Sequence, residues 1–585
     1  MSNYTPLHVY SHYSVGRGLA NPKEIAAYAK KLGMNACALT DINNMAGCIE
    51  FYKACQKEKI KPIIGCTIMT EQGSIVLIAL NKSGYNELLK ITADLNSGKD
   101  YLELAALLDY DLDNLIGIVG YEDSVLYRNM VSNFKIDENL NPAFNLMLEL
   151  RNKFSDNNLF IDIQFSECDK LSSELKEKYK EVAGAVQFIS SPRVYYLEQD
   201  DKELHKILLS VSENESLDDM NKINHKLYKF FDGYKYYMPP AEEILTFSNE
   251  EALQNTNKIA DLVEDYQLAK PASIPEFKCP KNEDTEKYFR ELCVKGFQKK
   301  LHDKLKKHDA KREYYYQRIE HEISVLKEAN LFNYFLILRD IITYAKDKGY
   351  LVGPGRGSVA GCLVAYLLDI HQIDSIKYDL IFERFYNKGR AGSLPDIDTD
   401  FPKRCRGEII KYITKKYGKE NVMLIATYST LMGRAALKAV FRANKNISFS
   451  EQNDITKNIV DKARISDELQ EMEEPSVIRW CLENKADELS AWCSIDDKGV
   501  LHGPLSKEFE QAIKLEGVIC NASKHAAGVV IGPEPLRNLV PIIYDNKDKQ
   551  QIIACQMNEL EFIGLVKLDC LSLSTLDRLE DVNEI

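Results

Sequence analysis

Three aspartates at every second position constrain this chain more than any other feature of its sequence. The segment LPDIDTDF carries Asp396, Asp398 and Asp400. Side chains alternate between the two faces of an extended strand, so all three carboxylates would lie on one face. Like charges this close repel one another, and a divalent cation with oxygen ligands relieves the repulsion. The pattern predicts a site for phosphoryl transfer by two metal ions, but an acidic, solvent-facing edge strand would show it too.

A glycine-rich segment upstream favours an anion-binding loop. GPGRGSVAG, residues 353–361, precedes an apolar run over 362–368 that we expect to be helical. Glycines let the backbone approach a ligand closely, and a helix that opens at Ser358 would point free N–H groups at an anion. Arg356 adds a forked donor for phosphate. The segment is neither a Walker A loop nor a dinucleotide-binding motif. The alternative is a glycine-rich turn that leads into a buried helix.

Two further segments combine charged groups with short apolar strands. In GLVKLDCLSLSTL, Lys567 and Asp569 share a strand face by period two. In NASKHAAGVVIGP, Lys524 and His525 precede another apolar strand. Each feature alone is more often structural than functional. Beside an acidic metal site, however, such cations suit a bound phosphate.

In their order along the chain, GPGRGSVAG, LPDIDTDF, NASKHAAGVVIGP and GLVKLDCLSLSTL, the four motifs resemble the alpha subunit of bacterial DNA polymerase III, the C-family replicative polymerase. The resemblance implies a polymerase-beta-like nucleotidyltransferase palm, in which Asp396, Asp398 and Asp569 are catalytic and hold two Mg²⁺ ions. Asp400 would support them. Around Arg390 the chain is one residue longer than is usual in the family. The residues that the resemblance places around the nucleotide are Gly357, Ser358, Arg356, Arg390, Lys524 and Lys567.

The N-terminal segments resemble the polymerase-and-histidinol-phosphatase domain, called PHP, whose active members bind three metals. By this alignment only His8 is retained among the expected ligands, so the PHP metal site is largely lost. The resemblance then implies a scaffold, and a metal-dependent phosphoesterase at this site is the least favoured hypothesis. The other expected ligand positions hold residues unsuited to a divalent ion, namely Tyr10, Arg17, Ile42, Thr67, Tyr121, Ser166, Pro192 and Val194.

The composition is that of a large globular protein. A length of 585 residues predicts three or four domains, and 45% of the residues are hydrophobic. No apolar run reaches the roughly twenty residues that span a bilayer, and no signal peptide opens the chain. The 14 cysteines include no CxxC pair, which argues against a zinc ribbon or a disulfide framework. We expect a cytoplasmic protein, in a bacterial cell or a phage-infected host, without a membrane partner.

The formal net charge of −13 is unfavourable for DNA binding unless basic residues cluster locally. Basic residues do gather in three stretches, 296–318, 403–416 and 434–445. A local basic cleft can coexist with an acidic remainder, although a solvated helix face is the alternative for each stretch.

The order of segments predicts an α/β and α+β multidomain fold. Residues 1–270 would form a degenerate PHP-type α/β barrel. A polymerase-beta-like palm would follow over 271–432 and resume over 513–585, with a helical thumb inserted at 433–512. In the family, fingers and further C-terminal domains come next, so we expect this chain to lack them, as a split gene or a truncated chain would.

These observations favour the palm portion of a template-directed DNA polymerase that joins dNTPs to a primer 3′-OH in DNA replication. The expected partners are primer-template DNA, dNTPs and a separate fingers-bearing polypeptide, through which a sliding clamp and other replisome proteins would bind. The alternative is a fragment of the replicative polymerase that binds DNA or a partner without chemistry. Retention of Asp396, Asp398 and Asp569 favours catalysis. No exonuclease motif is evident, so proofreading would come from elsewhere.

Overall fold

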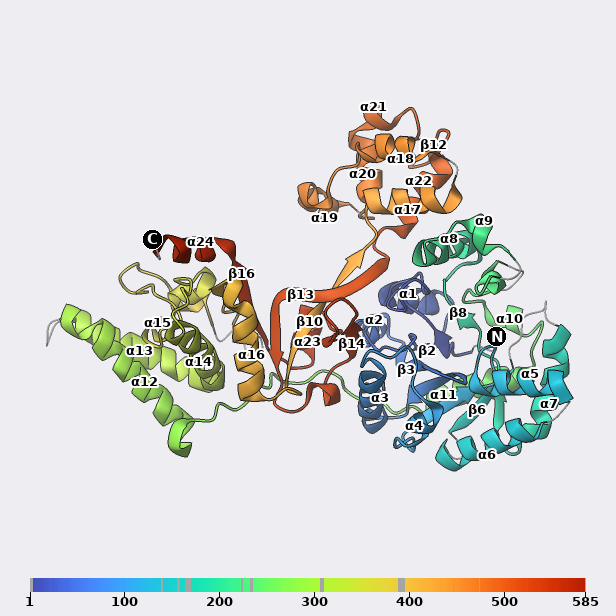
Figure 1. Cartoon of the computed structure of the whole chain (residues 1–585), viewed down its shortest axis with the longest axis horizontal. Coiled ribbons are helices and arrows are strands. Elements are labelled where there is room, and N and C mark those ends of the chain that lie inside the picture. The colour runs from blue at the N-terminus through green and yellow to red at the C-terminus, as the bar shows by residue number, and fades with distance from the viewer. Residues whose placement is uncertain are drawn as a thin grey trace. The chain divides into compact units, whose positions relative to one another are not determined.

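Contacts divide the chain into two compact units, and the boundary between them falls within two long strands. Figure 1 shows the elements of both units. The first unit comprises Met1–Tyr266, Thr427–Ser523 and Pro541–Gln550, and the second comprises Gln267–Ala426, Lys524–Val540 and Gln551–Ile585. The four-segment division from the sequence stays a prediction. The computed structural model describes residues 4–137, 140–154, 158–163, 170–222, 225–231, 235–305, 310–387, 395–445, 447–472 and 474–583.

The first unit begins with a six-stranded sheet in the order β2-β3-β4-β5-β6-β7. Its neighbours are parallel except where β4 pairs with β3 and β5, which are both antiparallel to it. A separate parallel pair, β1 and β8, adjoins β2, because Thr40 N donates to Val9 O at 2.8 Å. The strands are β1 (His8–Val9), β2 (Ala36–Leu39), β3 (Lys61–Thr70), β4 (Gly73–Ala79), β5 (Leu115–Val119), β6 (Leu159–Asp162), β7 (Gln187–Ile189) and β8 (Arg193–Val194).

The helices between these strands each bury one apolar side. The first begins at a capping box, in which Asn21 accepts from the backbone N–H of Glu24 while the Glu24 side chain accepts from Asn21 N. Its Ile25 and Ala29 are fully buried. The helices of this part are α1 (Pro22–Lys31), α2 (Cys48–Glu58), α3 (Lys82–Leu95), α4 (Leu104–Leu108), α5 (Val125–Asp137), α6 (Asn141–Phe154), α7 (Lys170–Ala183), α8 (Lys202–Glu213), α9 (Leu217–Met220), α10 (Ala241–Ile244) and α11 (Glu250–Leu262).

The same unit contains a mostly helical segment from the middle of the chain. Its helix α17 shares a buried apolar cluster with α8, where Leu437 and Phe441 join Leu208. An ion pair between Lys445 and Asp219 ties the two parts at 2.8 Å. The elements are α17 (Arg434–Asn444), α18 (Phe449–Thr456), α19 (Ser466–Glu471), α20 (Val477–Asn484), α21 (Ala486–Leu489), β11 (Ser494–Ile495), β12 (Leu501–His502), α22 (Ser506–Leu515) and β14 (Ile542–Asp545).

The second unit is built on strands that follow one another in the order β15, β10, β13, β16, β9. Parallel pairing of β9 with β16 sets Thr399 beside Cys570, and antiparallel pairing of β13 with β16 sets Gly528 beside Asp569. These strands come from opposite ends of the unit's sequence, so they bring distant segments together. They are β9 (Thr399–Pro402), β10 (Val422–Thr430), β13 (Ile519–Ile531), β15 (Gln550–Ile553) and β16 (Lys567–Leu573).

Helices surround this sheet and supply a compact apolar body. Within the described residues, no helix is long and apolar enough to span a membrane. Helices α12 and α15 lie so close at Gly296 that an added Cβ would stand 2.1 Å from Leu367 O. The helices are α12 (Thr285–Lys300), α13 (Ala310–Glu328), α14 (Phe332–Asp347), α15 (Leu363–Leu367), α16 (Arg406–Tyr417), α23 (Met557–Phe562) and α24 (Ser574–Asn583).

We predict that Gly296→Ala destabilises the second unit by about 1–3 kcal/mol, because the methyl group must push α12 away from the backbone of α15. Urea unfolding followed by circular dichroism measures the effect.

The matched control is Gly407→Ala, since Gly407 is also helical and an added Cβ there meets no atom within 4 Å. Alanine has a higher helix propensity than glycine. The free energy of unfolding of this variant should therefore be unchanged or raised by up to about 0.5–1 kcal/mol. Equal unfolding midpoints for the two variants would contradict the close approach of α12 and α15.

Candidate active site

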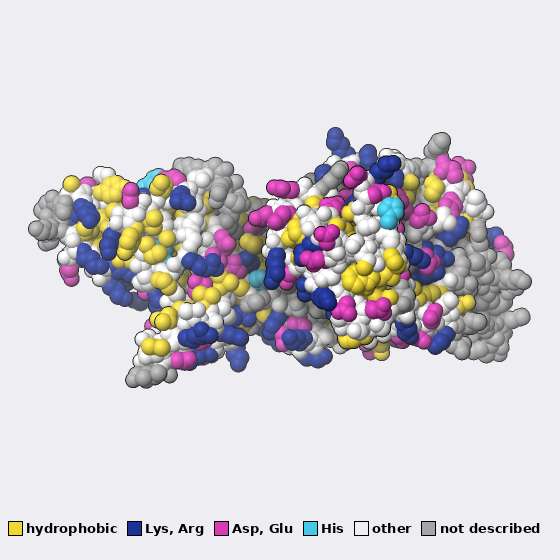
Figure 2. Space-filling view, turned by 90° about the horizontal axis from the view of Figure 1, so that it is seen from above, with side chains coloured by type: hydrophobic (Ala, Val, Ile, Leu, Met, Phe, Trp, Pro, Cys, Tyr) yellow, Lys and Arg dark blue, Asp and Glu magenta, His cyan; other side chains and the backbone are white. Residues whose placement is uncertain are grey.

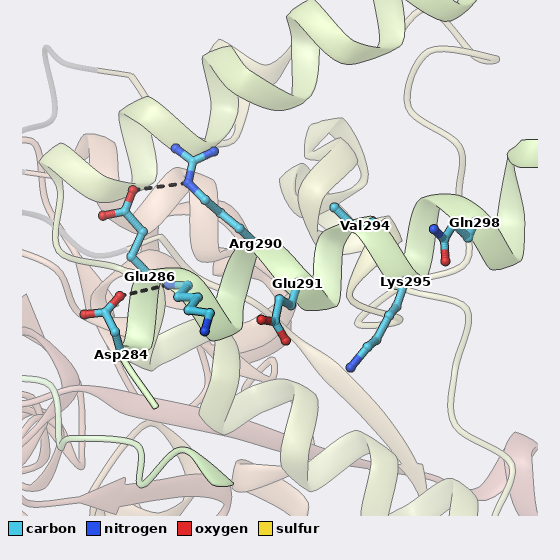
Figure 3. Close-up of a pocket in the computed structure, with 8 residues that line it drawn as sticks. Asp284, Glu286, Arg290, Glu291, Val294, Lys295 and Gln298 are labelled. Carbon is cyan, nitrogen blue, oxygen red and sulfur yellow. Dashed lines mark hydrogen bonds and ion pairs between the residues drawn. The ribbon is translucent and has the colours of Figure 1, made fainter. Parts of the chain in front are cut away.

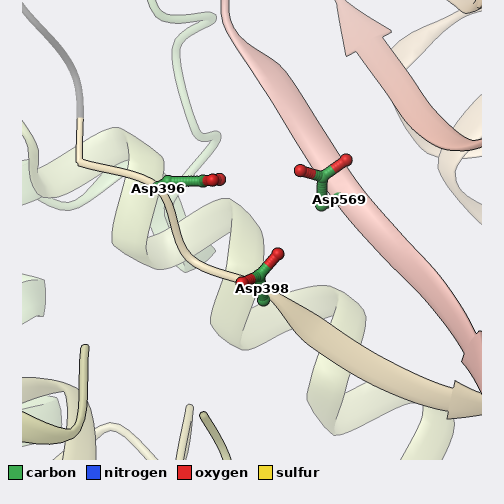
Figure 4. A group of neighbouring side chains, drawn as sticks. All are labelled: Asp396, Asp398 and Asp569. Carbon is green, nitrogen blue, oxygen red and sulfur yellow. The ribbon is translucent and has the colours of Figure 1, made fainter. Parts of the chain in front are cut away.

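Asp396, Asp398 and Asp569 lie together although they come from distant parts of the sequence. Asp398 directly precedes β9 and Asp569 lies in β16, and the parallel register of the two strands places them side by side. Asp396 reaches the same space from the extended segment before β9, as Figure 4 shows. One carboxylate oxygen of each residue lies within 4.8 Å of the others. The three side chains therefore form one cluster of oxygen ligands.

Two cations of the chain partly neutralise this cluster. Arg356 Nη2 lies 3.1 Å from Asp398 Oδ1, and Arg356 Nε lies 3.4 Å from Asp400 Oδ1. Lys567 Nζ lies 2.6 Å from Asp569 Oδ2. Partial burial, followed by the charges of Asp398 and Asp569, still raises the pKa of Asp396 above its usual value. The cluster thus retains uncompensated negative charge.

The cluster suits a divalent cation. The buried Asp569 leaves Oδ1 without a hydrogen-bond partner, although a buried carboxylate oxygen normally has one. Carboxylate oxygens are the ligands that Mg²⁺ and Ca²⁺ prefer. Across the described parts of the chain, this is the one group of three or more His, Cys, Asp or Glu side chains with such spacing. Asp569 Oδ1 is therefore a ready ligand for a metal ion.

The glycine-rich segment lies against the aspartates. Gly353 N donates to Asp400 O at 2.9 Å, and a Cβ on Gly353 would stand 2.8 Å from the Cβ of Asp400. Gly357 has a φ of +72°, and a Cβ there would lie 4.0 Å from Asp398 Oδ2. Glycine at 353 thus permits the close packing of the loop on β9. Arg356 and Ser358, later in the loop, are exposed to solvent.

The helix expected after this loop differs from the sequence prediction. A 3-10 turn over Gly357–Gly361 comes first, and only Leu363–Leu367 is α-helical. The N–H groups that open this α15 are not free for an anion, because the buried Glu322 accepts from Val364 N at 2.8 Å. Only the N–H groups of the exposed 3-10 turn could therefore meet a ligand, and the expected contribution of a longer helix is lost.

The remaining predicted site residues lie on β13 or outside the described residues. Gly528 pairs with Asp569, and Lys524 lies four residues earlier on the same strand. His525 turns back on its own strand, where its Nδ1 accepts from Gly528 N at 2.9 Å. Arg390 lies outside the described residues, as does Ser166 of the PHP alignment. The structure therefore groups Arg356 and Lys567 directly with the aspartates.

Sequence reasoning missed three buried side chains that support the site. Tyr334 is 2% exposed on α14, and its hydroxyl is hydrogen-bonded to the backbone of Ile397, between two of the aspartates. Burial, followed by the charge of Asp396, raises its pKa well above the usual range. Glu322 caps α15, and Glu580 on α24 accepts from Leu351 N. The i,i+4 spacing of Arg318 and Glu322 was the one available signal.

Around His8 the first unit has aromatic side chains and a buried ion pair. His8 Nε2 is hydrogen-bonded to the Tyr10 hydroxyl, and the ring centroids of His8 and Tyr121 are 4.5 Å apart. Arg193 pairs with Glu122 beside them. Burial, with a further contribution from the Arg193 charge, lowers the pKa of His8 well below its usual value. Neutral imidazole is the form of histidine that binds metal ions, but the adjacent guanidinium charge of Arg193 would repel a divalent cation.

Many residues of the basic stretches are committed to internal contacts. Arg318 pairs with Glu322 at 2.7 Å, Lys416 pairs with Asp340, and Arg434 Nε donates to Ile459 O. On the face in Figure 2, basic and acidic side chains are interspersed. The stretches therefore serve packing and capping in part, and they supply less positive charge to a ligand than their composition suggests.

A shallow depression runs along α12 (Figure 3). Its lining includes Arg290, which pairs with Glu286, and the half-exposed Val294. All of the lining residues come from α12 or its N-cap, Asp284. Ligand sites need polar groups that converge from several elements, so this depression offers no comparable site.

Two family models match the chain. The PHP domain matches residues 6–166, and the Bacterial DNA polymerase III alpha NTPase domain matches residues 287–572. The second match spans the glycine-rich loop and the three aspartates Asp396, Asp398 and Asp569.

Curated relatives match along the whole chain. The DNA polymerase III alpha subunits of Borreliella burgdorferi and Bacillus subtilis are each 32% identical over 100% of this chain and 49% of their own length. The alpha subunit of Pseudomonas aeruginosa is 30% identical over 100% of this chain and 48% of its own length. The chain thus spans about half the length of the curated relatives it matches. It carries a PHP domain and the NTPase domain of the bacterial DNA polymerase III alpha subunit, and it belongs to that family.

Proposed function

We propose that this chain is the palm-bearing part of a template-directed DNA polymerase in DNA replication. The observation that supports it best is the meeting of Asp396, Asp398 and Asp569 beside the loop over 353–361. Nucleotidyl transfer needs carboxylates for metal ions next to a grip for phosphates, and these elements provide both. In this proposal the second unit contains the palm, and the helical segment at 433–512 is the thumb.

The proposed roles follow the positions of the side chains. Asp396, Asp398 and Asp569 would hold two divalent ions, for which Mg²⁺ is the natural candidate with oxygen ligands alone. Such ions, when bound, stabilise the charge on the attacking and leaving oxygens. Arg356 and the backbone of the 3-10 turn at Gly357 would hold the triphosphate.

The reaction would form a bond between the primer 3′-oxygen and the α-phosphorus of a dNTP, while pyrophosphate leaves. Lys567 lies against Asp569, so it would meet a phosphate that enters the cluster. Lys524 and Arg390 are proposed as further cations for the nucleotide. Primer-template DNA and dNTPs are therefore the proposed ligands.

We predict that Asp398→Asn lowers primer extension at least about a hundredfold, equivalent to about 2.7 kcal/mol of activation free energy. Asparagine keeps the shape of the side chain but removes the charge that two cations would share. Extension is measured on a labelled primer-template, with the chain supplied together with the remaining half of an alpha subunit.

The control variant is Asp303→Asn, because the Asp303 side chain is 98% exposed. It should extend primers at the rate of the unaltered chain. Full activity in the Asp398→Asn variant would refute the site, and inactivity of both variants would point to a general loss of folding.

We propose further that extension depends on a fingers-bearing region, which the family resemblance implies. Closure over the nucleotide aligns the template and excludes water, and lost alignment can cost several kcal/mol of barrier. This chain alone should therefore extend primers poorly and gain activity when a fingers-bearing polypeptide is added. Fast extension by the chain alone would contradict this dependence.

If the chain binds primer-template DNA but stays inactive in every combination, the non-catalytic alternative holds. A gel-shift assay run beside the extension assay distinguishes the two.

We also propose that the PHP domain is a scaffold that holds no metal cluster. The support is Arg193, whose guanidinium lies close enough to lower the pKa of His8. Its charge opposes a divalent ion in the same place. Clamp and replisome contacts, which the family resemblance implies, are proposed for a fingers-bearing partner.

Elemental analysis tests the scaffold proposal in the full chain. We expect no stoichiometric zinc or manganese in an Asp569→Asn variant, which weakens the palm site but leaves the PHP domain intact. One or more tightly held ions per chain in this variant would show a working PHP metal site.

A further inference from the structure

Helix α24 follows β16 directly and contacts the two other parts of the site. Its Glu580 is 9% exposed, and both carboxylate oxygens are in use. Leu351 N donates to Glu580 Oε1 at 2.6 Å, and Arg404 Nε donates to Glu580 Oε2 at 2.7 Å. Leu351 lies two residues before the glycine-rich loop, and Arg404 lies four residues after Asp400. One carboxylate thus joins the start of the loop to the end of the aspartate strand.

Asp577, one turn earlier on α24, strengthens this connection. Its carboxylate accepts from Lys403 N at 3.0 Å and from Arg404 N at 3.2 Å. These two bonds hold the segment directly after β9 against α24. Because α24 continues from β16, the loop, β9 and β16 all meet at this helix.

The pairing of Glu580 with Arg404 differs from an ordinary surface ion pair, which contributes about 0–1 kcal/mol to the free energy of unfolding. Asp581 is the local example of such a pair, since its side chain is 60% exposed and lies 2.9 Å from Arg404 Nη1. Glu580 is buried, and its partner at Leu351 is a backbone N–H that cannot turn to another acceptor. Charge-assisted bonds of this kind are stronger than neutral ones, and leaving the buried partner unpaired is costly.

We propose that Glu580 is a positioning residue that sets the position of the glycine-rich loop relative to the aspartate strand. This inference rests on the proposed function, in which a metal-bound triphosphate lies against both the loop and the strand. A metal ion alone needs only the aspartates, which the pairing of β9 with β16 holds. A triphosphate bound with its metal must contact loop and strand together. Loss of Glu580 should therefore weaken nucleotide binding more than metal binding.

The test compares Glu580→Gln with Asp581→Asn in the full chain. Calorimetric titrations with Mn²⁺ alone, and with dATP in saturating Mg²⁺, are run well below the unfolding temperature of every variant. Glutamine can still accept from Leu351 N but loses the charged bond to Arg404. We expect about tenfold weaker dATP binding and an Mn²⁺ affinity within about twofold of the unaltered chain for Glu580→Gln. Asp581→Asn should match the unaltered chain in both titrations.

Each other result counts against the inference. Unchanged dATP binding by Glu580→Gln would overturn it, and an equal loss of Mn²⁺ and dATP affinity would indicate general loosening instead of positioning. Asp398→Asn separates the two proposals. If that variant keeps its Mn²⁺ affinity, the proposed function fails, and the positioning role falls with it. If the unaltered chain binds no dATP, the positioning role fails. If Asp398→Asn loses Mn²⁺ affinity while Glu580→Gln behaves as the unaltered chain does, the positioning role fails alone.

Discussion

The parallel pairing of β9 with β16 is the constraint on which the proposed active site depends. It places Asp398 beside Asp569, with like charges facing each other on one side of the sheet. Such an arrangement costs free energy unless cations balance it. Arg356 in the glycine-rich loop pairs with Asp398, and Lys567 on β16 pairs with Asp569. One of the two strands that bring the aspartates together therefore also carries a cation that offsets part of their repulsion. The loop and α24 are then fixed around this pair.

Local periodicity in the sequence was enough to identify the chemical groups of the site. Alternation assigned Asp396, Asp398 and Asp400 to one face, and glycines at 353 and 357 marked a close approach of the backbone. In the structure a Cβ at Gly353 would collide with Asp400, which explains why a glycine fits at this position. Which strand would pair with β9 was beyond this reasoning, because register between distant strands leaves no local pattern. That pairing was available only through the family resemblance.

The features that the sequence did not reveal are bonds between a side chain and a distant backbone group. Glu322 caps α15 across 42 positions, as measured to Val364, and Glu580 reaches Leu351 across 229 positions. Neither bond changes the hydrophobic periodicity of its own helix. The run over 362–368 was therefore expected to be one helix, whereas a 3-10 turn and a short α15 occur. The bonds of Asp577 and Glu580 that hold α24 in place are likewise not marked by any local pattern.

Charge balance explains how the proposed site could take a polyanionic ligand in a chain with a net charge of −13. At the site, four carboxylates (Asp396, Asp398, Asp400 and Asp569) face two cations, Arg356 and Lys567, so the ionised cluster has an excess of two negative charges. A triphosphate accompanied by two divalent ions is close to neutral, because four positive charges meet about four negative ones. Its entry would leave the net charge of the cluster almost unchanged. Arg356 and Lys567 would then exchange carboxylate partners for phosphate without a large electrostatic penalty, and a strongly basic surface is not required for this step.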